Sequence, residues 1–261
     1  MIRFGPAGFG MPSLKGLEHT KELGLTAAEV EFTYGVRMNN KTAEQLGIKA
    51  KKLGIALSVH APYYINLATP DKKKLANSYR NVLQSCERAH FMHANPVVFH
   101  PAFYGKLEKN ECYQLVKQRI LELKDQIKKQ GLKVQLAPET TGKPTQFGSF
   151  EEIMRLVHET KCSFCVDFAH LYARNLGKID YNQLLKQLKR FKHIHAHFSG
   201  IEYTEKGEKR HIPLKKAFFL PLAKALLKYK PDITIINESP NIYDDAVKMK
   251  KWLEELRKPK K

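Results

Sequence analysis

The chain has 261 residues, with 45 Lys and Arg against 26 Asp and Glu, which gives a formal net charge of +19. This length allows a single large domain with a full core, and the charge favours polyanionic partners, nucleic acid first and an acidic membrane surface second. A charge-rich surface without any such partner is the simpler alternative.

Membrane segments and disulfides are not expected. No apolar run approaches the ~20 residues of a membrane span, and the N-terminus lacks a signal-peptide pattern, so we expect a cytoplasmic protein. The four cysteines, Cys86, Cys112, Cys162 and Cys165, are too few and too scattered for a disulfide framework. Cys162 and Cys165 have the spacing of a redox or zinc pair, but no second pair completes a zinc site. We therefore expect them to pack in the core.

Strand and helix signals alternate along the whole chain. Eight apolar runs predict strands at Ile2–Phe4, Ala28–Thr33, Ile55–His60, Pro96–His100, Lys133–Glu139, Ser163–Asp167, His193–Phe198 and Ile233–Glu238. Helices are predicted at Ser13–Leu23, Thr42–Leu53, Lys73–Ala94, Asn110–Gln130, Ser149–Thr160, Tyr181–Arg190, Leu214–Lys230 and Asp244–Arg257. Several begin at a capping residue and end before a glycine.

Eight strand-then-helix units with continuously apolar strands predict an α/β fold, a parallel (β/α)8 TIM barrel, rather than an open doubly wound sheet. No linker or composition shift divides the chain, so we expect one domain over residues 1–261. Glu202–Arg210 is the only markedly polar loop, and Lys258–Lys261 is expected to be a flexible basic tail.

Polar residues stop the apolar runs at the strand ends where a barrel places its active site. These residues are His60, His100, Glu139, Asp167, His195 or His197, and Glu238. A lone histidine at such a place is more often structural. Six strand ends that all supply imidazole or carboxylate favour a metal site, because several carboxylates buried together need cations.

This donor set predicts more than one ion. Imidazole and carboxylate without thiolate suit Zn²⁺, with Mn²⁺ or iron as alternatives, and six ligands are too many for one tetrahedral ion. Glu139 could bridge two ions and so make a water nucleophilic toward phosphorus. His170 and His211 could hold a further ion, although His211 could equally be a solvated loop residue.

Arg37, Tyr63 and Tyr64 follow the second and third strands on the same rim. Aromatic side chains beside an arginine are suited to stacking on bases and to filling a gap in a duplex. Ordinary lid packing explains the tyrosines equally well.

Five short motifs together resemble a known family. They are His60-Ala-Pro-Tyr-Tyr-Ile-Asn-Leu67, Phe99-His-Pro101, Pro138-Glu139-Thr with Phe147-Gly-Ser-Phe-Glu-Glu152, Cys165-Val-Asp-Phe-Ala-His170, and Asn237-Glu-Ser-Pro240. Over nearly its whole length the chain resembles the endonuclease IV family, the zinc-dependent apurinic/apyrimidinic endonucleases with a xylose-isomerase-like barrel.

The resemblance implies a set of roles. The first zinc would take His60, His100 and a bridging, catalytic Glu139. The second would take Glu139, Asp167, a strand-seven histidine and Glu238, and the third would take His170 and His211. Tyr63, Tyr64 and Arg37 would enter DNA at the lesion.

The chain departs from the family pattern in three places. His195-Ala-His197 replaces a His-Leu-Asn-Asp-like run, and we expect His195 rather than His197 to be the ligand. Lys209 stands where the family has an Asp ligand, so either Glu208 substitutes for it or the third ion binds weakly. The first strand ends in Phe4-Gly-Pro-Ala-Gly rather than the family's Gly-x-His-Val-Ser, which suggests a divergent branch.

The predicted function is a monomeric DNA-repair phosphodiesterase that uses two or three Zn²⁺ ions. It would cut double-stranded DNA 5′ to abasic sites and leave a 3′-hydroxyl. The main alternative is a metal-dependent sugar isomerase or epimerase on the same barrel, which would need one ion. A catalytically weak nucleic-acid-binding relative is the third possibility.

Overall fold

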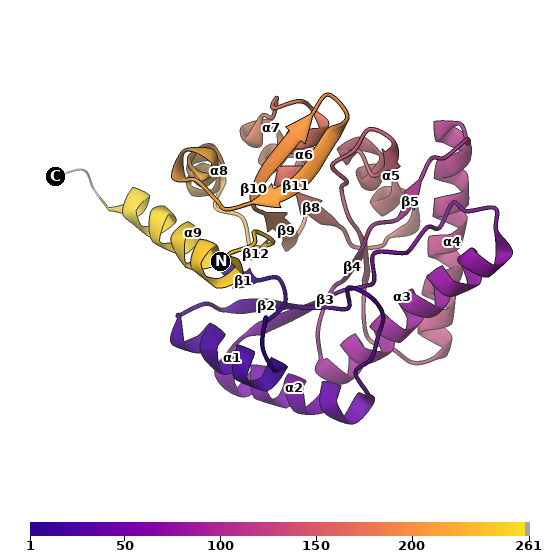
Figure 1. Cartoon of the computed structure of the whole chain (residues 1–261), viewed down its shortest axis with the longest axis horizontal. Helices are drawn as coiled ribbons and strands as arrows, with labels where there is room; N and C mark the ends of the chain where they lie inside the picture. The colour runs from indigo at the N-terminus through magenta and orange to yellow at the C-terminus, as the bar shows by residue number, and fades with distance from the viewer. Residues whose placement is uncertain (259–261) are drawn as a thin grey trace.

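Parallel strands form the wall of a closed barrel in the computed structural model, which describes residues 1–258 (Figure 1). The wall strands are β1 (Ile2–Pro6), β2 (Ala27–Glu31), β3 (Ala56–His60), β4 (Val97–Phe99), β6 (Leu136–Pro138), β8 (Cys165–Asp167), β9 (Ile194–Phe198) and β12 (Ile233–Asn237). They pair as two parallel sheets, in the orders β1-β12-β9-β8 and β2-β3-β4-β6. Bridges from Ala7 to Glu29 and from Glu139 to Cys165 join the two sheets at both seams. The predicted TIM-barrel fold is confirmed.

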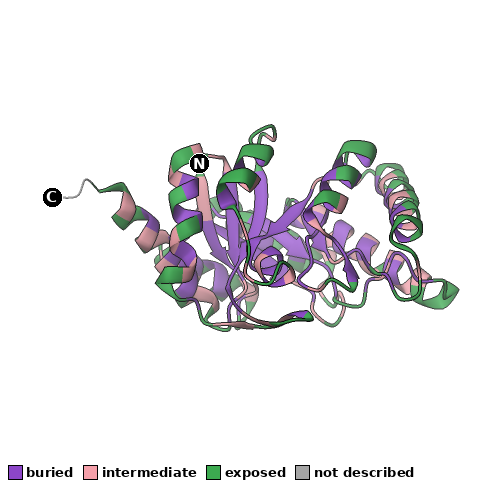
Figure 2. Ribbon diagram, turned by 90° about the horizontal axis from the view of Figure 1, so that it is seen from above, coloured by how far each residue is buried: buried purple, intermediate pink, exposed green. Residues whose placement is uncertain are grey.

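Helices surround the strands (Figure 1). They are α1 (Ser13–Glu22), α2 (Asn40–Leu53), α3 (Lys72–Met92), α4 (Lys109–Lys129), α5 (Phe150–Thr160), α6 (Phe168–Arg174), α7 (Tyr181–Leu188), α8 (Lys216–Tyr229) and α9 (Ile242–Arg257). The inner faces of the helices and the strands are buried, whereas the outer helix faces are exposed (Figure 2). Strands covered on both sides have no face toward solvent, which explains their largely apolar sequence.

Local sequence signals set several helix ends. Ser149 and Glu152 form a reciprocal capping box at the start of α5, and Asn39 accepts the backbone N–H of Thr42 at the start of α2. Gly54 ends α2 with φ +70°, a left-handed conformation that glycine adopts without strain.

Several predicted boundaries were wrong. The predicted strand Lys133–Glu139 is only Leu136–Pro138, and α6 follows β8 directly, where no helix was expected. The short strands β5 (Ala102–Phe103) and β7 (Gln146–Phe147) form a separate antiparallel pair outside the two parallel sheets. No helix within residues 1–258 is long and apolar enough to cross a membrane. Residues 259–261 of the expected basic tail lie outside the described residues.

The predicted loop Glu202–Arg210 is instead a hairpin of β10 (Gly200–Thr204) and β11 (Gly207–Ile212). Its strands are mostly polar, so they lack the hydrophobic signal by which strands are recognised. Figure 1 shows the hairpin beside α6, at one side of the barrel opening.

Candidate metal centre

A cavity of about 390 Å³ lies where the carboxyl ends of the barrel strands meet. Its lining includes Glu31 from the end of β2, His100 after β4, His170 on α6 and Glu238 after β12. Residues far apart in the sequence therefore face one space, which is where this fold places its active sites.

Glu139 lies at the centre of the first donor group. This fully buried carboxylate follows β6. Its Oε2 lies 3.2 Å from His60 Nε2 and 3.0 Å from His100 Nε2, whereas its Oε1 lies 3.0 Å from His197 Nδ1. One carboxylate therefore faces imidazoles from three strands, as a bridging ligand would.

A second donor group shares Glu139 and adds Asp167, His170 and Glu238, whose donor atoms lie within 4.8 Å of one another. Asp167 caps α6, and its Oδ1 accepts the backbone N–H of His170 at 2.7 Å. Its Oδ2 is buried without a hydrogen-bond partner among the described residues. A buried carboxylate oxygen left unpaired beside other donors fits coordination of a cation.

A third group consists of His170, Glu208 and His211. His170 Nε2 lies 3.3 Å from His211 Nε2 and 3.6 Å from Glu208 Oε2. Lys209, which occupies the family's Asp position, points away and pairs with Glu202 Oε1 at 2.7 Å. Of the two possibilities that the sequence offered, substitution by Glu208 or weak binding of the third ion, this geometry favours substitution by Glu208.

A β-bulge brings Glu208 and His211 to one side of β11. Tyr203 pairs with Glu208 but Glu202 pairs with Arg210, so Lys209 is the extra residue. Without the bulge, residues 208 and 211 would point to opposite faces. Gly142 leaves room for the carboxylate, because a Cβ there would lie 2.5 Å from Glu208 Oε2.

The two histidines of β9 occupy different places. His197 Nδ1 faces Glu139 and also lies 3.2 Å from Glu238 Oε1. His195 lies one inward-facing position deeper, and its Nε2 is 2.9 Å from Glu29 Oε2 instead. The structure therefore places His197, and not the expected ligand His195, beside Glu139 and Glu238.

The sequence analysis missed two carboxylates, Glu29, which is buried, and Glu31, which is partly buried. Both belong to β2, and the alternation Glu29-Val30-Glu31 inside an apolar strand was the available signal. Glu31 lines the cavity and has a buried oxygen, Oε1, without a partner among the described residues.

Burial and mutual charge shift the ionisation of this centre. Burial raises the pKa of Asp167 and of Glu31 to about 8. Burial would also raise the pKa of Glu139, but the charges of His197 and His100 outweigh it and hold that pKa well below its usual value. For His60, burial opposes protonation, yet the charge of Glu31 and the hydrogen bond to Glu139 raise its pKa to about 10. Without metal, the centre therefore keeps protons at neutral pH.

The stability of the metal-free protein should fall as pH rises from about 6.5 to 9. The native state then holds protons on His60, Asp167 and Glu31 that the unfolded chain has released, so the free energy of unfolding decreases. We expect the melting temperature to drop by roughly 5 °C or more across this window. Zn²⁺ would replace the protons on His60 and Asp167, so the melting temperature of the loaded protein should depend less on pH. Calorimetry of both forms measures this, and a metal-free melting temperature that rises with pH would contradict it.

The rim residues lie at different depths. Tyr63 is 49% exposed and lines the cavity, with its ring centroid 5.9 Å from that of His60. Tyr64 is 68% exposed and does not line the cavity. Arg37 is exposed and borders a neighbouring recess that shares Glu31 with the main cavity. Of the three residues, Tyr63 alone lines the main cavity within the described chain, where its ring lies near His60 and His100.

Comparison with known proteins gives matches of several kinds. Residues 17–258 match the model of a family described as xylose isomerase-like TIM barrel. An uncharacterised protein of Methanocaldococcus jannaschii is 38% identical, with 98% of each chain covered. A probable endonuclease 4 of Mycoplasma mobile is 30% identical, with 73% of each chain covered.

Solved structures match as well. The endonuclease IV of Thermus thermophilus matches with a TM-score of 0.72 and 20% identity, over 97% of this chain and 99% of that one. A D-tagatose 3-epimerase-like protein matches with a TM-score of 0.71 and 20% identity, over 97% of this chain and 96% of that one. At such identities these likenesses show the shared fold, and the fold serves both a nuclease and an epimerase-like protein.

Proposed function

Because the chain belongs to the xylose isomerase-like TIM barrel family, we propose that it is a zinc-dependent DNA-repair endonuclease of a divergent endonuclease IV branch. It would cut the phosphodiester bond 5′ to abasic sites and leave a 3′-hydroxyl. The observation that carries this proposal is the overlap of three donor groups, which share Glu139 and His170. One ion would need only one such group.

The donors fit the proposed metal. Nitrogen and oxygen donors without thiolate suit Zn²⁺, and Mn²⁺ remains an alternative. Zn²⁺ supplies Lewis-acid chemistry and an activated water when it is bound. In the proposed assignment, the first ion takes His60, His100 and Glu139, and the third takes His170, Glu208 and His211. The second takes Glu139, Asp167 and Glu238 from the second donor group together with His197, which replaces His170 there because its Nδ1 faces Glu139 and Glu238.

The chain's own groups would bind and orient the substrate. An abasic nucleotide lacks base pairing, so it is easily extruded from the duplex and its sugar could enter the cavity. Lys143 borders the cavity and offers a cation to a phosphate. Tyr63, Tyr64 and Arg37 lie on the rim, where they could occupy the gap left by the extruded nucleotide. The net charge of +19 favours salt-dependent binding of DNA.

A sugar isomerase or epimerase is the second candidate. Glu139 and Glu238 both approach His197, so two carboxylates could flank a sugar at a single ion and transfer a proton. Such an enzyme would leave the group of His170, Glu208 and His211 without a role.

The test uses a DNA duplex that carries one tetrahydrofuran abasic analogue. We expect a single nick 5′ to the analogue that chelators abolish and Zn²⁺ restores, with an undamaged duplex of the same sequence as the control. Elemental analysis should find two or three ions per chain. One ion together with epimerisation of a ketohexose would favour the second candidate. Binding without cleavage in the zinc-loaded protein would favour a catalytically weak nucleic-acid-binding protein.

A further inference from the structure

A buried carboxylate lies beneath the metal centre and has no part in the function proposed above. Glu29, in β2, is completely buried inside the barrel. Its Oε2 accepts a hydrogen bond from Ser58 Oγ at 2.6 Å and lies 2.9 Å from His195 Nε2. Its Oε1 lies 2.9 Å from His197 Nε2. A carboxylate in a barrel interior is costly unless partners of this kind surround it.

The His197 ring connects Glu29 to the proposed metal site. Its Nδ1 lies 3.0 Å from Glu139 Oε1 and 3.2 Å from Glu238 Oε1, whereas its Nε2, on the other side of the ring, faces Glu29. Neither Glu29 Oε1 nor His197 Nε2 makes a hydrogen bond within residues 1–258, so their 2.9 Å approach is a contact between a carboxylate and an imidazole rather than an aligned hydrogen bond. Of the carboxylates around the ring, Glu29 is the one that faces Nε2, whereas Glu139 and Glu238 face Nδ1.

We propose that Glu29 is a positioning residue that holds the proton of His197 on Nε2 and thereby leaves Nδ1 free to bind metal. Carboxylates face both nitrogens, but Glu139 and Glu238 beside Nδ1 belong to the proposed metal site. With an ion there, the single proton of a neutral imidazole would stay on Nε2 beside Glu29 and Nδ1 would present its lone pair. Metal-binding histidines in general donate their second N–H to such a partner, which fixes the tautomer and the ring orientation. Ser58 and His195 hold Glu29 in place.

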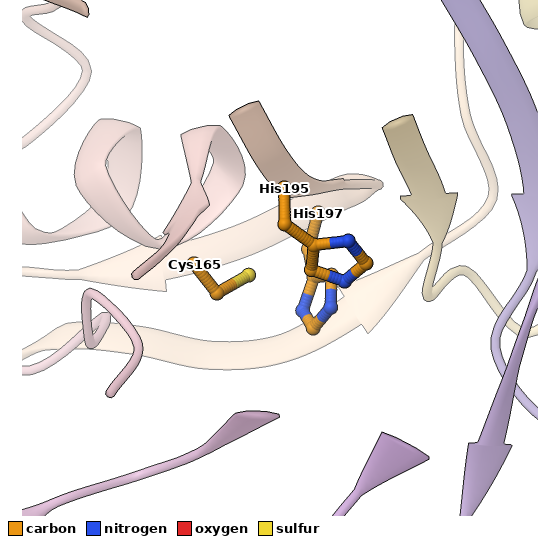
Figure 3. Close-up of side chains that lie close together, drawn as sticks. All are labelled: Cys165, His195 and His197. Carbon is orange, nitrogen blue, oxygen red and sulfur yellow. The ribbon is translucent and has the colours of Figure 1, made fainter. Parts of the chain in front are cut away.

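The same region offers a competing arrangement. Cys165, His195 and His197 also lie close enough together to hold an ion, and Figure 3 shows the sulfur of Cys165 on the side of the two imidazoles. An ion there would use a thiolate. The sulfur instead packs with Val98 and Ala137 in an apolar cluster, and Glu29 already faces Nε2 of both histidines.

Cobalt binding tests the proposal, which rests on the metal centre proposed above but not on its substrate. Metal-free protein is titrated with Co²⁺, and the visible absorption gives the number of ions and their affinities. Glu29→Gln keeps the side-chain volume, and we expect one ion to bind about 10- to 100-fold more weakly. The other ions and the melting temperature of the metal-free protein should change little, which separates positioning from a general structural role. Cys165→Ala, in the same layer, is the matched control and should bind cobalt as the wild type does.

Three results would overturn the proposal. They are wild-type affinity for every ion in Glu29→Gln, a thiolate-to-cobalt charge-transfer band that Cys165→Ala removes, or no cobalt binding by the wild-type protein. If Glu29→Gln does not fold, Ser58→Ala serves instead, because it removes a donor to Glu29 without contacting His197. It should weaken the same ion by up to about 10-fold, and unchanged affinity there would also count against the proposal. A wild-type protein that binds the ions but leaves abasic DNA intact would refute the proposed nuclease function. The cobalt titrations would still test the positioning role of Glu29.

Discussion

Glu139→Gln is expected to lower kcat/KM on the abasic duplex by about 10³-fold or more, equivalent to about 4 kcal/mol of transition-state stabilisation. The carboxylate lies within 3.2 Å of His60, His100 and His197, and no other residue belongs to both of the first two donor groups. An amide keeps the volume but not the charge that two neighbouring cations require. Nicking under single-turnover conditions measures the rate, and elemental analysis should find fewer bound ions.

The same variant should still bind the duplex, because the basic surface and the rim residues are unchanged. Glu151→Gln is the matched control, since Glu151 is exposed on α5 away from the cavity. It should cut at the wild-type rate. A Glu139→Gln protein with more than about a tenth of wild-type activity would rule out a bridging role.

Glu208→Gln and Lys209→Ala should behave in opposite ways. Glu208 faces His170 and His211, so its loss should remove about one ion per chain and slow cleavage by about 10- to 100-fold. Lys209 is 56% exposed and paired with Glu202, so Lys209→Ala should keep both the ion count and the rate. Elemental analysis and nicking rates test both variants.

Lys209→Asp makes this contrast sharper, because it introduces at position 209 the Asp that the resemblance to endonuclease IV leads us to expect there. The bulge points this position away from His211, so the added carboxylate should not strengthen metal binding. Tighter binding in Lys209→Asp, or normal binding in Glu208→Gln, would show that the hairpin has another register in solution.

Much of the barrel could be predicted from sequence because its signals are local. Apolar runs of three to seven residues between amphipathic helices indicate strands buried on both faces, and glycines such as Gly54 indicate helix ends. Strand boundaries were predicted less well, because strand length depends on pairing with neighbouring strands. The strand predicted from Lys133, for example, begins only at Leu136. The polar hairpin was missed because neither of its strands has an apolar face.

The candidate site was predictable only in part. His60, His100, Glu139, Asp167 and Glu238 all stop apolar strands, and the structure brings these residues around one cavity and its floor. The choice between His195 and His197 was not predictable, because residues two apart on a strand share a face and differ only in depth. Glu29 escaped notice because its partners come from β3 and β9, which are distant in sequence.

By itself the sequence determined the barrel, the net charge and the residue types at its strand ends, because each follows from composition or from a short periodic pattern. Only the tertiary structure decided which histidine of β9 faces Glu139, which carboxylate lies beneath that histidine, and that Glu208 rather than Lys209 approaches His211. Those outcomes depend on depth in the barrel and on one extra residue in a β-bulge, and neither is encoded in local hydrophobic periodicity.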